Sequence, residues 1–190
     1  MSFDLVFFGG TGDLTWRKLM PALFQAFRHG KLPPNGRILA VARDEQTDEQ
    51  YRAWIKERFQ DVEGAKRPSD EEFARFAELL HYRRMDLSQP EHYVRLKEWL
   101  GEPRPIDGRT DGQADTVVLY FATSPHLFPQ ICEQLGVAGL NQARIRVVLK
   151  NRSVMIWPAR RKSTASCARC SAKNRRFAST TIWASLRCRT

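Results

Sequence analysis

The sequence predicts an α/β fold in which a doubly wound parallel sheet occupies residues 1–149. Two observations lead to this prediction. Short apolar runs alternate with amphipathic stretches of helical length along these residues, and strands that alternate with helices form parallel sheets with right-handed crossovers. The first apolar run also ends in glycines that open a helical stretch, which is typical of the first turn of such a sheet. Residues 150–190 show neither pattern, and we expect no domain there.

The first two strands are predicted on either side of a helix. Residues 4–8 are a short apolar run, as expected for a buried strand, and 9–12 supply the glycine turn after it. Apolar side chains then recur at helical spacing over 14–29. Pro21 should destabilise or kink this helix unless it lies near the first turn. After a loop that contains two prolines, the apolar run 37–42 predicts the second strand.

Helices and strands continue to alternate through the rest of the body. Ser69 and Glu72 have the spacing of a capping box, which predicts a helix that begins there and continues to Leu80. The segment 101–114 is rich in Gly, Pro and Asp, and we predict a loop. The other expected elements are helices at 47–59, 90–100 and 126–135 and strands at 81–85, 116–121 and 144–149.

The net charge of the chain lies in its last 40 residues. The whole chain has 31 Lys and Arg against 21 Asp and Glu, a formal net charge of +10. Ten of the basic residues and none of the acidic ones lie in 151–190, so the 21 that remain balance the acidic residues of the body. A basic chain suggests a nucleic-acid binder. Because the body is neutral, we expect no nucleic-acid partner, and removal of the tail should abolish any such binding.

Cysteine usage indicates a reducing compartment. Cys132 is the one cysteine of the body, which excludes a disulfide framework there. Cys167 and Cys170 have a Cys-x-x-Cys spacing, but the tail has only Cys188 as a third thiol and no His, so no metal site is expected. No apolar run reaches the roughly 18 residues of a membrane span, and the first residues lack a signal-peptide pattern. We therefore expect a cytoplasmic protein with no membrane partner.

The turn after the first strand has the composition of a phosphate-binding turn. Gly9, Gly10 and Gly12 carry no Cβ, so backbone amides at a helix N-terminus can approach a pyrophosphate. The letters do not follow G-x-G-x-x-G, and a plain glycine turn after a strand would look similar. The position of the turn between a strand and a helix favours a dinucleotide site.

The end of the second strand bears on which coenzyme is bound. NAD-binding domains usually place a carboxylate there for the ribose hydroxyls, whereas an arginine accommodates the 2′-phosphate of NADP. Arg43 follows this strand and favours NADP, although solvated arginines are common at strand ends. Asp44 beside it leaves NAD open.

The run GGTGDLTWRKLMPALF at Gly9–Phe24 resembles the opening motif of the glucose-6-phosphate dehydrogenases, a Gly-rich turn followed by Asp-Leu, Arg-Lys-Leu and Pro-Ala-Leu. The resemblance covers residues 3–149, and this motif is much longer than a generic dinucleotide fingerprint. Further agreements in order and spacing are Ala-Arg at 42–43, Met-Asp-Leu at 85–87, Tyr-Phe-Ala at 120–122, Ser-Pro at 124–125 and Val-Val-Leu at 147–149.

The resemblance implies a Rossmann-like domain that binds NADP, and a set of coenzyme contacts. It implies an oxidoreductase of the pentose phosphate pathway, which converts glucose 6-phosphate to 6-phosphogluconolactone. Trp16 departs from the family pattern, which has a small or basic residue there. The implied contacts are Gly9, Gly10, Thr11, Gly12, Asp13 and Leu14 around the phosphates, Arg17 and Lys18 near the coenzyme, Arg43 at the 2′-phosphate, Asp86 and Leu87 near the adenine, and Thr123, Ser124 and Pro125 near the nicotinamide.

The family pattern stops after Leu149. The family continues with Glu-Lys-Pro and later with Arg-Ile-Asp-His-Tyr-Leu-Gly-Lys, which carry the substrate lysine and the catalytic histidine, and neither motif is present here. One base restored just before the codon for Lys150 makes both motifs compatible with the chain, the second over Phe177–Ser185. We therefore predict that 150–190 is a basic tail translated out of frame, and that disorder is to be expected in it.

The resemblance assigns a family activity that this chain should lack by itself. No catalytic residue is assigned in the chain, since both motifs are absent, and the family's homo-oligomer interface is expected to be missing with the second domain. The implied small-molecule substrate is glucose 6-phosphate. Two alternatives are a non-catalytic NADP-binding fragment and another NADP-dependent sugar-phosphate oxidoreductase, against which the long opening motif argues.

Overall fold

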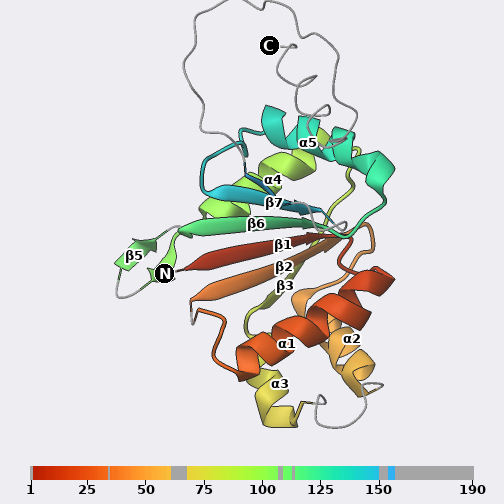
Figure 1. Ribbon diagram of the computed structural model, residues 1–190, viewed down its shortest axis with the longest axis vertical. Coiled ribbons are helices and arrows are strands. Elements are labelled where there is room, and N and C mark those ends of the chain that lie inside the picture. Colours follow the sequence, from red (N-terminus) through yellow and green to blue (C-terminus); the bar gives the residue numbers. More distant parts are fainter. Residues whose placement is uncertain are drawn as a thin grey trace, which may run out of the picture.

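A six-stranded sheet forms the centre of the computed structural model, which describes residues 2–33, 35–60, 68–106, 109–112, 114–149 and 154–156. The strand order is β3-β2-β1-β6-β7-β8 (Figure 1). Every neighbouring pair from β3 to β7 is parallel, which confirms the predicted parallel α/β sheet. The strands are β1 Phe3–Phe8, β2 Gly36–Ala42, β3 Leu80–Arg84, β6 Thr116–Phe121, β7 Ile145–Leu149 and β8 Val154–Ile156.

Helices cover both faces of this sheet, as a doubly wound fold requires. On one face α1, α2 and α3 pack over β1, β2 and β3, and on the other α4 and α5 pack over β1, β6 and β7 (Figure 1). The strand order therefore reverses between β1 and β6. The helices are α1 Met20–Arg28, α2 Asp48–Gln60, α3 Asp70–Ala77, α4 Pro90–Gly101 and α5 Phe128–Val137.

A π-helical turn, η1 (Thr15–Leu19), precedes α1 and accommodates Pro21. The Met20 N–H donates to the carbonyl of Thr15, five residues earlier. A proline has no N–H to donate, and in a regular α-helix its ring would clash with the carbonyl four residues before it. The wider turn avoids this conflict and leaves Pro21 in the first turn of α1, where proline is tolerated.

The predicted capping box is present at the start of α3. The Glu72 N–H donates to the Ser69 hydroxyl at 3.2 Å, and the Ser69 N–H donates to the Glu72 carboxylate at 3.1 Å. The helix ends at Ala77, earlier than we predicted. The reason is that the Leu79 carbonyl already accepts from Ile38 of β2 at 2.7 Å, so the chain has joined the sheet by then.

Three further differences from the prediction concern a loop, the start of a helix and the tail. The segment expected to be a loop contains an antiparallel pair, β4 Arg104–Ile106 and β5 Arg109–Gly112, because residues typical of turns do not exclude short strands around a turn. The helix expected from residue 126 begins at Phe128, after the short 3₁₀ turn η3 (Pro125–Leu127). In the tail, β8 pairs antiparallel with β7 and extends the sheet beyond Leu149.

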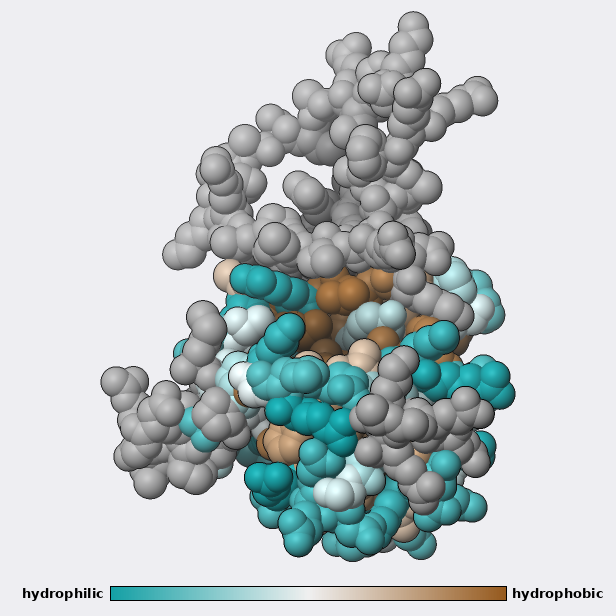
Figure 2. All heavy atoms as spheres, turned by 60° about the horizontal axis from the view of Figure 1, so that its bottom comes forward, coloured by the Kyte–Doolittle hydropathy of each residue, from teal (hydrophilic) through white to brown (hydrophobic). Residues whose placement is uncertain are grey.

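The helices leave part of one sheet face uncovered. Val118 on β6 and Val148 on β7 point to the side of α1–α3, yet both are half-buried and belong to neither helix-covered core. Figure 2 shows apolar surface gathered in the middle of the molecule, whereas the end formed by α1, α2 and α3 is mostly polar. Among the described residues, no helix is long and apolar enough to cross a lipid bilayer.

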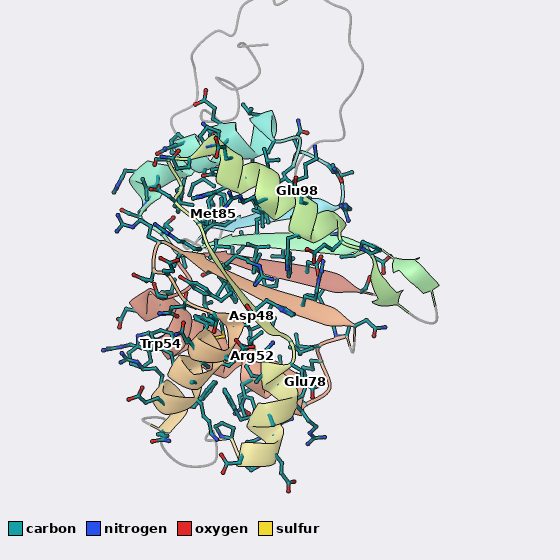
Figure 3. The ribbon with its side chains drawn as sticks, turned by 180° about the vertical axis from the view of Figure 1, so that it is seen from behind. Asp48, Arg52, Trp54, Glu78, Met85 and Glu98 are labelled. Atoms are coloured by element: carbon teal, nitrogen blue, oxygen red, sulfur yellow. The ribbon has the colours of Figure 1, made fainter. Side chains whose placement is uncertain are left out.

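The outer strand β3 is held to α2 through its backbone (Figure 3). The Asp48 carboxylate accepts from the Tyr82 N–H at 2.8 Å, and the Arg52 guanidinium donates to the Leu80 carbonyl at 3.0 Å. These contacts satisfy polar groups of a strand edge that would otherwise face solvent. They also fix α2 alongside β3.

Candidate functional site

The glycine turn lies at the carboxyl end of β1 and is bonded to the neighbouring strand. The N–H groups of Gly9 and Gly10 both donate to the Val41 carbonyl at 2.9 Å. Within the turn the Gly12 N–H donates to the Gly9 carbonyl at 3.0 Å, and the buried Thr15 hydroxyl donates to that carbonyl at 2.9 Å. The turn is therefore held from β2 and from the helix that it opens.

At each glycine of the turn a side chain would be strained or crowded. Gly9 has a φ of +94°, a conformation that side chains strongly disfavour. A Cβ on Gly10 would lie 2.5 Å from the Cβ of Ala40, and one on Gly12 would lie 3.1 Å from the Gly9 carbonyl oxygen. Without side chains the turn packs closely against β2 and the segment after β6, as the tight first turn of a dinucleotide-binding sheet requires.

The turn adjoins the predicted nicotinamide segment at the point where the strand order reverses. A Cβ on Gly9 would lie 3.2 Å from Cγ2 of Thr123, which follows β6. In open α/β sheets, ligands bind at this switch point, beyond the carboxyl ends of the strands. The Thr123 hydroxyl is buried and has no hydrogen-bond partner among the described residues. The Ser124 hydroxyl lies 2.8 Å from Nδ1 of His126, beside Pro125 in η3.

The end of β2 lies against the same turn. The Thr11 hydroxyl donates to the Asp44 carboxylate at 2.8 Å, which joins the turn to the loop after β2. Arg43 and Asp44 are both exposed, so a positive and a negative side chain stand together beside the turn. This arrangement combines the arginine typical of NADP sites with the carboxylate typical of NAD sites.

Asp86 and Leu87 follow β3 at the same edge of the sheet. The Asp86 carboxylate accepts from the N–H and the hydroxyl of Ser88, at 2.9 and 2.7 Å. These hydrogen bonds, foremost the one from the Ser88 backbone, lower the pKa of Asp86, and the positive charge of Arg43 adds to the effect. The carboxylate is therefore ionised and committed to its own turn. Leu87 packs against the core beneath α4 and α5.

The predicted contacts that follow the turn lie on an exposed helical surface. The Asp13 carboxylate pairs with the Arg17 guanidinium at 2.8 Å, and both side chains are largely exposed. The same guanidinium lies 4.8 Å from the centre of the Trp16 ring. Lys18 is exposed and Leu14 half-buried. In this structure the Arg17 guanidinium thus contacts neighbours on its own helical segment. The coenzyme contacts of Arg17 and Lys18 stay predictions.

Two buried tyrosines that hydrogen-bond to the loops of the site were not predicted from the sequence. The Tyr51 hydroxyl donates to the Gly10 carbonyl at 2.9 Å, and the Tyr82 hydroxyl donates to the Asp44 carbonyl at 2.6 Å. A buried tyrosine needs a hydrogen-bond partner for its hydroxyl, and that need was the available signal. Among the described residues, no cluster of His, Cys, Asp and Glu could hold a metal ion.

Comparison with known proteins connects this site to one family. Residues 6–151 match the family model described as the NAD binding domain of glucose-6-phosphate dehydrogenase. The glucose-6-phosphate 1-dehydrogenase of Mycolicibacterium smegmatis is 38% identical over 148 residues, which are 77% of this chain and 29% of that protein. The enzyme of the same name from Gluconobacter oxydans is 39% identical over 154 residues, with 78% and 29% covered.

Solved structures agree with these matches. The crystal structure of glucose-6-phosphate 1-dehydrogenase from Mycobacterium avium superposes with a TM-score of 0.65 at 28% identity, over 78% of this chain and 29% of that one. A glucose-6-phosphate dehydrogenase in complex with glucose 6-phosphate shows the same fold, with a TM-score of 0.62 at 23% identity. The chain spans less than a third of the length of the relatives that it matches.

Proposed function

Because the chain belongs to the glucose-6-phosphate dehydrogenase family, we propose that residues 1–149 form its coenzyme-binding domain and that the coenzyme is NADP. The observation that carries the proposal is the glycine turn, pressed against Ala40 of β2 and adjoining Thr123 at the switch point. Backbone amides of the turn and the helix N-terminus bind the phosphates, and Thr123, Ser124 and Pro125 lie beside the nicotinamide. The bound coenzyme supplies the hydride acceptor.

Arg43 is the proposed determinant of the preference for NADP. Its exposed guanidinium at the end of β2 can pair with a 2′-phosphate. Equilibrium binding of NADP⁺ and NAD⁺ to the wild type and to Arg43→Ala tests this. We expect the substitution to weaken NADP⁺ binding by about tenfold or more, the factor for one charge-assisted pair, with NAD⁺ little affected. Equal effects on both coenzymes would argue against the assignment.

The proposed activity of the whole enzyme is oxidation of glucose 6-phosphate, and we propose that the 190-residue chain does not perform it alone. The motifs that the family uses for the substrate lysine and the catalytic histidine are absent from its sequence. Among the described residues, the helices leave Val118 and Val148 of the sheet only half-buried, which suits a domain that normally packs against further chain. Substrate-dependent NADPH formation by the purified chain would contradict the proposal.

We further propose that residues 150–190 are translated out of frame. In support, the family match ends at residue 151, where the sequence becomes basic and loses its acidic residues. Sequencing the DNA across the codons for Leu149 to Arg152 tests this directly. An additional base that restores Glu-Lys-Pro would support the proposal, and family motifs absent in all three frames would contradict it.

The environment proposed for the protein is the cytoplasm, with no nucleic-acid or membrane partner. In support, Cys132 is a free thiol and the described residues contain no disulfide, as is usual for proteins of a reducing compartment. The homo-oligomeric interface expected for the family is proposed to lie outside this chain. Removing residues 151–190 should leave coenzyme binding unchanged and abolish any retention on DNA.

A further inference from the structure

Two stacked tyrosines connect the core to both loops of the candidate coenzyme site. Tyr51 of α2 and Tyr82 of β3 have ring centroids 5.0 Å apart, with planes inclined by 28°. Both residues are almost fully buried. Each hydroxyl ends on a main-chain carbonyl at the carboxyl edge of the sheet, that of Tyr51 on Gly10 and that of Tyr82 on Asp44.

The Tyr51 hydroxyl fixes the orientation of the peptide group between Gly10 and Thr11. The carbonyl and the following N–H of a trans peptide point to opposite sides, and the described residues contain no cis peptide. Because the Gly10 carbonyl points to the buried Tyr51 hydroxyl, the Thr11 N–H points away from the core. It donates to no acceptor among the described residues, so it is available to an anionic group.

The Tyr82 hydroxyl fixes the loop after β2 in a similar way. It holds the Asp44 carbonyl, while the Asp44 carboxylate accepts from the Thr11 hydroxyl. The tyrosine itself is anchored, since its N–H donates to Asp48 at the start of α2. Burial raises the pKa of both tyrosines, that of Tyr82 to about 12, so both hydroxyls remain protonated donors at neutral pH.

We propose that Tyr51 and Tyr82 are positioning residues that hold the two coenzyme-binding loops in place. Tyr51 orients the turn that faces the pyrophosphate, and Tyr82 orients the loop that faces the 2′-position of the adenine ribose. This inference rests on the proposed coenzyme function and extends it to buried residues that do not touch the ligand. NADP and NAD share the pyrophosphate and differ only at the 2′-position. Loss of the Tyr51 hydroxyl should therefore weaken the binding of both coenzymes, whereas loss of the Tyr82 hydroxyl should weaken the binding of NADP alone.

The test uses Tyr51→Phe and Tyr82→Phe in the 190-residue chain, with calorimetric binding of NADP⁺ and NAD⁺. Both substitutions keep the stacked rings and remove one hydroxyl. We expect Tyr51→Phe to raise both dissociation constants equally, by about three- to tenfold, the factor for one buried hydrogen bond. We expect Tyr82→Phe to raise the dissociation constant of NADP⁺ by a similar factor and the dissociation constant of NAD⁺ by less than about twofold.

A matched control and a second measurement keep the outcomes distinct. Tyr120→Phe removes a hydroxyl from a half-buried ring that packs edge-on against Phe7, and it should change neither constant. Hydrogen exchange without coenzyme should be faster at the Gly12 amide in Tyr51→Phe and unchanged in β6. Exchange that is unchanged at Gly12, or faster throughout the sheet, overturns the role of Tyr51. Equal weakening of both coenzymes by Tyr82→Phe overturns the role of Tyr82.

The same data separate this inference from the proposed function. If the wild-type chain binds neither coenzyme, the proposed function fails and the role of both tyrosines in positioning a ligand fails with it. The exchange of the Gly12 amide then still decides whether the Tyr51 hydroxyl holds the turn. If the wild type binds NADP⁺ and neither tyrosine variant differs from it, the proposed function stands and the positioning role is refuted.

Discussion

Replacing Gly10 with alanine is expected to destabilise the fold and weaken coenzyme binding together. The new Cβ would lie 2.5 Å from the Cβ and 3.1 Å from the Cα of Ala40. Ala40 is fully buried in β2, where it pairs with Phe7 of β1 and Tyr82 of β3. Strand β2 is held on both sides and cannot retreat, so the turn must move instead.

The size of the effect follows from what that movement disrupts. Forcing a methyl group into a well-packed region typically costs about 1–3 kcal/mol. Displacing the turn also stretches the hydrogen bonds from Gly9 and Gly10 to Val41, both 2.9 Å long, and each is worth about 1 kcal/mol. We therefore expect the free energy of unfolding to fall by about 2–4 kcal/mol.

Urea unfolding followed by circular dichroism measures the loss, and Gly136→Ala is the matched control. Gly136 lies within α5, and nothing is within 4 Å of its Cβ position. Alanine there should stabilise the protein by about 0.5–1 kcal/mol, because glycine is a poor helix former. If Gly10→Ala unfolds at the wild-type urea concentration, the contact between turn and strand is refuted. A destabilised Gly10→Ala that binds NADP⁺ normally would remove the turn from the coenzyme site.

Three further substitutions test the charges around the fold and the site. Hydrogen bonds, foremost those from Arg28, lower the pKa of Glu72 to about 2. The ionised Glu72 therefore contributes to the free energy of unfolding above its unfolded pKa, and this contribution is lost as the pH falls from about 4.5 towards 2. Glu72→Gln should then make the urea midpoint depend less on pH in this acid range. Arg37→Met leaves the fully buried Asp4 without its bidentate partner and should cost about 3–5 kcal/mol in urea unfolding. Asp44→Asn removes a negative charge beside the proposed 2′-phosphate site and should raise the NADP⁺ over NAD⁺ affinity ratio by about three- to tenfold.

Each of these substitutions has a control of the same chemistry. Glu78→Gln, on an exposed residue just after α3, should leave the pH dependence of the urea midpoint unchanged. Arg84→Met breaks a largely exposed pair with Glu45 and should cost less than about 1 kcal/mol. Glu45→Gln should alter the coenzyme ratio by less than about twofold. A variant that behaves like its control would contradict the corresponding prediction.

Local pattern determined the order of the elements and the place of the turn. Apolar runs of strand length predicted β1, β2, β6 and β7 to within one residue at each end, because a strand buried on both faces is built mostly from apolar side chains. The glycine turn could be recognised from the sequence because the absence of a Cβ is a property of glycine itself. The capping box at Ser69 was equally local, since both of its hydrogen bonds join residues three apart.

Only the tertiary structure decided which distant groups meet. Tyr51 and Gly10 are 41 residues apart, and Asp4 and Arg37 are 33 apart, so no local pattern links them. Parallel strands bring their carboxyl ends to one edge of the sheet, and that alone places Thr123 against Gly9 and Asp44 against Thr11. The sequence by itself determined that a dinucleotide turn would form. The packing of α2 beneath that turn determined how the Gly10 carbonyl is held, and β3 determined how the Asp44 carbonyl is held in the loop after β2.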